Sequence, residues 1–78
     1  VSKMYVLLAY EKDGGYYDEL FRNKDLKYVE ATGMGLIPVL KNNTLRACNG
    51  EPYDWLEIWN YEMDDIEPLL IITANGCL

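Results

Sequence analysis

Two short apolar runs flank a pair of asparagines in the middle of the chain, Asn42-Asn43, and glycines stand at both ends of this unit, at Gly35 and Gly50. Asparagine tolerates the positive φ that a two-residue hairpin turn requires. The pattern therefore predicts a β-hairpin over residues 35–50, and we expect the rest of the chain to pack around it.

The N-terminal part predicts a strand, a helix and a second strand. Residues 3–11 are almost continuously apolar, which is typical of a central strand covered on both faces. After a Gly-Gly break, residues 16–24 repeat tyrosine, leucine and phenylalanine at helical spacing, which predicts a short amphipathic helix. Residues 26–31 alternate as in a strand, and residues 32–35 form a loop. A helix between two strands predicts a βαβ unit with parallel strands.

The C-terminal part predicts a second helix over residues 52–63, with Asn49 or Gly50 at its cap and Pro52 at its first position. Its apolar stripe consists of Trp55, Leu56, Trp59 and Met63. Residues 69–73 form a last strand, followed by a turn at residues 74–76. The predicted fold class is therefore α/β, a small β-α-β-β-α domain with an extra C-terminal strand, in which residues 1–78 make a single domain.

The net charge of −6 is concentrated in one segment. All 7 lysines and arginines lie within residues 1–50, together with six of the 13 acids. The other seven acids lie from Glu51 onward. An acidic segment of this kind disfavours nucleic acid and anionic membranes as binding partners. It favours a partner protein with a basic surface.

Several kinds of chemistry are excluded by composition. The chain has no His, and Ser2 is its one serine, so Ser-His-Asp and Cys-His catalytic arrangements cannot form. Cys48 and Cys77 do not make a Cys-x-x-Cys pair, and we expect two reduced thiols with no metal and no cofactor. The absence of a signal-peptide pattern and of a long apolar run predicts a cytoplasmic protein.

The predicted order of elements resembles the thioredoxin superfamily, and small glutaredoxins in particular. In that family an apolar residue precedes a cis-proline at the start of the third strand, a hairpin follows, and a Gly-rich turn opens the last helix. Ile-Pro-Val-Leu at residues 37–40 is similar to the first feature, and Asn-Gly at residues 49–50, followed by an aspartate, is similar to the last. The resemblance covers residues 3 to about 62 and implies a thioredoxin-like core, in which Pro38 and Gly50 are structural residues.

The chain departs from that family where the catalytic motif would stand. Residues 13–16 are Asp-Gly-Gly-Tyr in place of Cys-x-x-Cys, so no thiolate is available at a helix N-terminus. The resemblance thus implies a scaffold that has lost its chemistry. The alternative is a glutaredoxin-like thiol-disulfide oxidoreductase that uses Cys48 in a non-standard way, with Arg46 as the nearby cation.

The second predicted helix supplies the candidate binding surface. Its face opposite Trp59 carries an isoleucine and a tyrosine set among acids. These residues are Asp54, Glu57, Ile58, Tyr61 and Asp64. Tyrosine supplies contact area in protein interfaces, and carboxylates steer a basic partner. The opposing interpretation is that the isoleucine or the tyrosine packs under the last strand, so that the acids only keep the domain soluble.

The predicted function is therefore that of a non-catalytic, small acidic protein-binding module. Small acidic proteins encoded by phages and mobile elements often inhibit a partner by covering its basic surface, and by this analogy in size and charge we expect an inhibitor of viral type.

Overall fold

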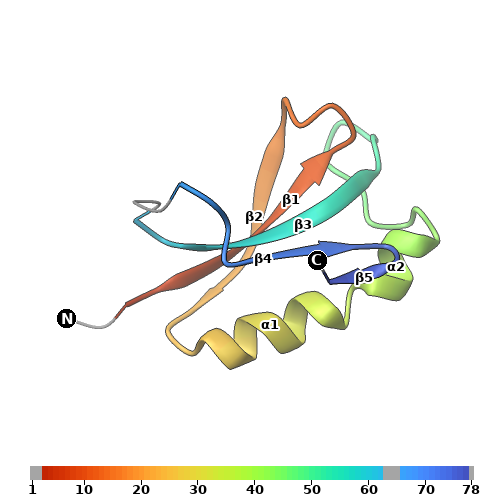
Figure 1. Cartoon of the computed structure of the whole chain (residues 1–78). Coiled ribbons are helices and arrows are strands. Elements are labelled where there is room, and N and C mark those ends of the chain that lie inside the picture. The colour runs from red at the N-terminus through yellow and green to blue at the C-terminus, as the bar shows by residue number, and fades with distance from the viewer. Residues whose placement is uncertain (1–2, 63–65, 78) are drawn as a thin grey trace.

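The computed structural model describes residues 3–62 and 66–77, which form a five-stranded sheet with helices on one face (Figure 1). The elements are β1 (Tyr5–Glu11), β2 (Tyr17–Asn23), α1 (Leu26–Met34), α2 (Ile37–Lys41), β3 (Tyr53–Asn60), β4 (Leu70–Thr73) and β5 (Gly76–Cys77). The strand order is β2-β1-β3-β4-β5, and each neighbouring pair is antiparallel. The predicted α/β fold is therefore wrong: these strands form neither a parallel βαβ unit nor a thioredoxin-like core.

The predicted central strand near the N-terminus is confirmed as β1. It pairs with β2 on one side and with β3 on the other, which satisfies its backbone groups along both edges. Its middle residues Val6, Leu7, Leu8 and Ala9 expose between 0% and 3% of their surface. Continuous apolarity marks this strand in the sequence because both of its faces are covered.

The predicted helix over residues 16–24 is wrong, because this segment forms the edge strand β2. A turn after β1 brings the chain back beside that strand as an antiparallel hairpin (Figure 1). A bulge in the pairing allows the adjacent residues Leu20 and Phe21 both to pack against the core. Two neighbouring apolar residues on one side imitate helical spacing in the sequence.

The predicted strand over residues 26–31 is also wrong, because the chain forms helix α1 there. Asp25 caps this helix, and its side chain accepts a hydrogen bond from the backbone N–H of Lys27 at 3.0 Å. Leu26, Val29 and Gly33 recur at spacings of three and four and face the sheet. Alternation over only six residues does not distinguish a strand from one side of a helix.

The predicted hairpin over residues 35–50 is wrong as well. Its first half is the short helix α2, and its second half is a loop that one isolated bridge, between Arg46 and Pro52, ties to the start of β3. Asn43 has the positive φ expected of it, 55°, but it follows the end of α2.

Neither helix of the described residues has the length and apolar character that a membrane crossing needs.

The two residues predicted to be structural take other roles. Pro38 stands in the first turn of α2, where its missing N–H costs no hydrogen bond, and the peptide bond before it is trans. It therefore does not begin a strand as a cis-proline. Gly50 has a φ of 88° and turns the loop toward β3, so that it caps no helix.

The predicted helix over residues 52–63 is wrong, because the segment forms β3. Leu56 and Ile58 are fully buried on the side of the helices, whereas Trp55, Glu57 and Trp59 alternate with them on the other side. Large apolar side chains on both faces of a strand produce a dense pattern that resembles a helical stripe. The predicted last strand and the turn after it are confirmed by β4 and its connection to β5.

The hydrophobic core lies between the sheet and the helices. Its buried members are Leu7, Ala9, Val29, Leu40, Ala47, Tyr53, Leu56, Ile58 and Ile72. Helix α1 approaches the sheet closely at Gly33, where an added Cβ would lie 2.6 Å from Cδ1 of Ile72 and 3.1 Å from Cδ1 of Leu7. The helix can pack at this distance only because Gly33 has no side chain.

Replacement of Gly33 by alanine should lower the free energy of unfolding by about 1–3 kcal/mol, because the new methyl group overpacks the core. Gly35→Ala is the matched control, since a Cβ there would meet only carbonyl oxygens at 3.4 and 3.5 Å and the φ of −66° suits alanine. Urea unfolding followed by tryptophan fluorescence compares the two variants. Equal destabilisation by both would contradict the close approach at Gly33.

Candidate protein-binding face

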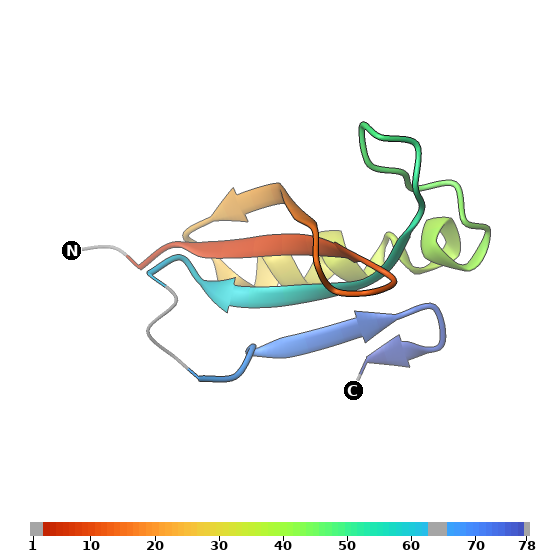
Figure 2. The ribbon, with the colours of Figure 1, turned by 90° about the horizontal axis from the view of Figure 1, so that it is seen from above.

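One side of the sheet carries α1 and α2, and neither covers the other side, which faces the viewer in Figure 2. We call this other side the open face. By register its side chains are Val6, Leu8 and Tyr10 of β1, Tyr17, Glu19 and Arg22 of β2, Trp55, Glu57 and Trp59 of β3, and Ile71 and Thr73 of β4. Val6 and Leu8 are nevertheless only 3% exposed. The larger side chains around them therefore take the place of a covering helix.

Three aromatic rings stand in one row across the open face. Tyr10 pairs with Tyr17 of β2 and with Trp55 of β3, so the register brings all three side chains side by side. The rings of Tyr10 and Trp55 are nearly parallel, with centroids 5.2 Å apart, and those of Tyr10 and Tyr17 are 5.1 Å apart. Such pairs add about 0.5–1.5 kcal/mol beyond the burial of their area. The row is a rigid platform at one end of the face.

The next row is centred on the carboxylate of Glu57. The indole N–H of Trp55 donates to one of its oxygens and the indole N–H of Trp59 to the other, each at 2.7 Å. Both tryptophans lie two residues away on the same strand face, because side chains alternate along β3. A half-buried carboxylate is thus fixed in position by neutral donors, which leaves its negative charge uncompensated.

Tyr10 is sensitive to this charge. Partial removal of its hydroxyl from water, together with the nearby Glu57 carboxylate, raises the pKa of Tyr10 from 10.0 to about 12. The tyrosine is therefore a neutral hydrogen-bonding group on the open face at any physiological pH.

The basic side chain of the open face is already engaged. Arg22 donates to both carboxylate oxygens of Glu19 at 2.6 and 2.8 Å, and its guanidinium lies 4.5 Å from the ring centroid of Tyr61. This is the one ion pair within residues 3–62 and 66–77. No cation of that part of the chain is paired with Glu57.

A hollow of about 510 Å³ opens beside Glu57, between the first half of β3 and the end of β4. It is lined by Asp54, Trp55, Glu57, Ile71, Thr73, Ala74 and Asn75. Its walls combine two carboxylates, one indole ring and an apolar side. This composition suits a cationic group attached to an aliphatic chain.

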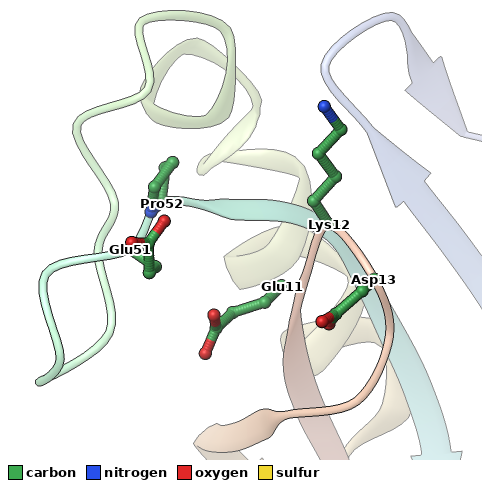
Figure 3. A pocket seen from close by; sticks show the side chains of 5 residues that line it. All are labelled: Glu11, Lys12, Asp13, Glu51 and Pro52. Atoms are coloured by element: carbon green, nitrogen blue, oxygen red, sulfur yellow. The ribbon is translucent and has the colours of Figure 1, made fainter.

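A second hollow, of about 610 Å³, lies between the β1–β2 turn and the loop before β3 (Figure 3). It is lined by Glu11, Lys12, Asp13, Glu51 and Pro52. Glu11 accepts a hydrogen bond from Asn49 at 3.3 Å, and Lys12 points away from the other side chains (Figure 3). The described residues contain no group of three or more ligands that could hold a metal ion, here or elsewhere.

The structure places the predicted partner-binding residues in different surroundings. Asp54 and Glu57 come together at the hollow beside β4. Ile58 points to the opposite side and is 0% exposed, so its predicted place on a binding surface is corrected. Tyr61 follows the end of β3 and is 48% exposed, next to Arg22. Asp64 lies outside the described residues.

The cysteine of the enzymatic alternative lies apart from the open-face hollow. Cys48 is exposed in the loop before β3, and its Sγ lies 3.7 Å from the hydroxyl of Tyr16. Arg46, the expected activating cation, donates instead to the carbonyl of Gly50 at 2.9 Å. Cys77 is also free, and its sulfur contacts that of Met34. A redox role for Cys48 stays a prediction from the sequence.

Sequence reasoning missed the aromatic residues that give this face its character, namely Tyr10, Tyr17, Trp55 and Trp59. The spacing of two between Trp55, Glu57 and Trp59 could have revealed the strand. It was masked by Leu56 and Ile58, which fill the positions between them with apolar side chains.

No family model, curated protein or solved structure matches this chain. A relationship to the thioredoxin superfamily therefore rests on the quoted residues alone, and the sheet does not have the arrangement that this resemblance implied.

The raised pKa of Tyr10 predicts a pH dependence of stability. Because the folded state favours the neutral phenol, the contribution is fully present below pH 10 and is lost as the pH rises to about 12. The free energy of unfolding of the wild type should therefore fall more steeply between these values than that of Tyr10→Phe. Urea unfolding at a series of pH values tests this, with Tyr28→Phe on the exposed side of α1 as the control. Identical pH profiles for wild type and Tyr10→Phe would contradict the raised pKa of Tyr10.

Proposed function

We propose that this chain is a non-catalytic protein-binding module whose open face binds a basic surface of a partner protein. The observation that carries the proposal is Glu57, a carboxylate held by two indoles on an uncovered sheet, with no cation of the described chain paired to it. A basic partner is also what the distribution of charge along the sequence predicts. The proposed binding surface differs from the predicted helix face, because β3 is a strand and places Trp55, Glu57 and Trp59 on the open face.

The composition of the open face supports this role. Tyrosine and tryptophan are enriched among the residues that dominate binding energy in protein interfaces, because they bury much area and lose little conformational freedom. Tyr17 is 50% exposed at the sheet edge and Tyr61 is 48% exposed beyond the end of β3. The uncompensated carboxylate of Glu57 on the same face provides attraction for a basic partner and speeds its association.

The charge also favours protein over nucleic acid as the partner. Aromatic side chains on an open sheet stack on bases in several single-strand binding proteins, but those proteins combine them with a positively charged groove. Here the open face carries Glu19, Glu57 and the adjacent Asp54 against Arg22 alone, and the whole chain has a net charge of −6. Phosphates would be repelled.

The proposal includes an inhibitory role, in which the protein covers a basic surface of its partner. This part rests on the analogy in size and charge with small acidic proteins of phages and mobile elements. A cytoplasmic location is part of the proposal and fits two cysteines that are both free thiols.

Selection from a random peptide library displayed on phage, with the protein immobilised, tests the proposal. The selected peptides should carry more lysine and arginine than the starting library, and their association rate should fall as the salt concentration rises. Glu57→Gln should weaken their binding about tenfold, the equivalent of one lost charge pair on a half-buried face. Glutamine retains an acceptor for one indole, so the fold should survive.

Glu30→Gln on α1 is the matched control, because it removes the same charge from the side of the sheet that carries the helices. Its peptide affinity should equal that of the wild type. Peptides that are not basic, or basic peptides that bind wild type and Glu57→Gln equally, would overturn the proposal.

A further inference from the structure

The hollow beside Glu57 has one face built from an aromatic ring. Trp55 lies between Tyr10 on β1 and Thr73 on β4, its register partners on either side. Tyr10 stacks on one face of the indole, and the side toward β4 lines the hollow. Gly14 borders the ring at its far end, where an added Cβ would lie 3.3 Å from Cη2 of Trp55. Tyr10 and Gly14 thus hold the ring in place in the absence of a ligand.

The acidic groups of the hollow stand next to this ring. The indole N–H of Trp55 donates to Glu57 at 2.7 Å, so ring and carboxylate form one rigid unit. Asp54, which is exposed and occupies the extra position of a bulge in the β1–β3 pairing, adds a second carboxylate at the rim. Ile71 and Ala74 add apolar surface to the lining, and Thr73 and Asn75 add polar atoms.

We infer that this hollow binds an arginine side chain of the partner protein, with its guanidinium against the Trp55 ring and paired with Glu57 and Asp54. The inference rests on the proposed function and specifies which residue of the basic partner enters the open face.

Arginine fits this combination better than lysine does. Its guanidinium is planar, is weakly hydrated, stacks on indole rings and donates along several directions at once. A lysine ammonium is a compact, strongly hydrated charge that gains less from a flat ring. The aliphatic part of the arginine side chain would lie along Ile71 and Ala74, as such stems do on apolar surface.

Other occupants fit less well. An anionic group would meet two carboxylates. A second copy of this acidic chain would bring its own carboxylates to the same face, and the arginine of its open face is already paired with Glu19. These occupants are distinguished by the experiment below.

The test is a titration of the ¹⁵N-labelled full chain with the peptide acetyl-Gly-Arg-Gly-amide, followed by NMR. The indole N–H signal of Trp55, assigned with Trp55→Phe, reports directly on the hollow. We expect it to shift progressively, together with the backbone signals of Ile71 to Asn75. The same peptide with citrulline, which has the shape of arginine without its charge, should bind about tenfold more weakly or not at all, and the lysine peptide should bind more weakly than the arginine peptide.

Asp54→Asn provides the variant, because its side chain is exposed and the change preserves its size. It should weaken binding of the arginine peptide severalfold, whereas Glu30→Gln on α1 should leave it unchanged. Equal binding of the arginine and citrulline peptides, shifts confined to other parts of the molecule, or no shift at all would overturn the inference. A dimer detected by sedimentation and broken by Asp54→Asn would also overturn it, in favour of a second copy.

The two proposals fail separately. If basic peptides from the library bind the open face but tolerate exchange of each arginine for citrulline, the arginine site is wrong and the protein-binding role stands. If the library yields no basic binder, the proposed function is wrong whatever the short peptide does.

Discussion

The position of β1 in the sheet is the constraint on which the other elements depend. Its backbone is paired along both edges, with β2 on one side and β3 on the other, and its four central residues are almost completely buried. A short chain has few residues with which to cover a strand from every direction. The turn after β1 and the long return from α1 to β3 are the connections that bring those partners to it.

The two faces of β1 are covered by different means. On one face α1 packs directly on Leu7, and it comes close enough only because Gly33 lacks a side chain. On the other face Val6 and Leu8 are enclosed by the large side chains of the neighbouring strands. A single layer of aromatic and charged groups thus both completes the core and forms the outer surface, so the residues proposed to bind a partner also contribute to stability.

Glu57 shows how this double role is resolved. A carboxylate among aromatic rings loses hydration, and neutral donors can compensate for this without removing its charge. The two indole N–H groups satisfy the oxygens while the negative charge remains available. A lysine of the same chain that formed an ion pair with Glu57 would also compensate for the lost hydration. It would neutralise the charge and so remove the attraction for a basic partner. The uncompensated charge is what favours a binding role for this face over a purely structural one.

The sequence by itself determined the features that depend on composition or on one unambiguous pattern. Continuous apolarity identified β1, and a short apolar run identified β4. The types of β2, α1, α2 and β3 were decided only by tertiary structure. In β2 a bulge places neighbouring Leu20 and Phe21 on the same side, and in β3 the apolar residues occupy both faces, so each strand has the spacing of a helix. In α1 the periodic stretch is too short to reveal its period, because a nine-residue helix completes few turns. Patterns of this length fit a strand and a helix equally well. For β2 and β3 the strand is chosen because their pairing satisfies the backbone hydrogen bonds of β1, which is buried on both faces.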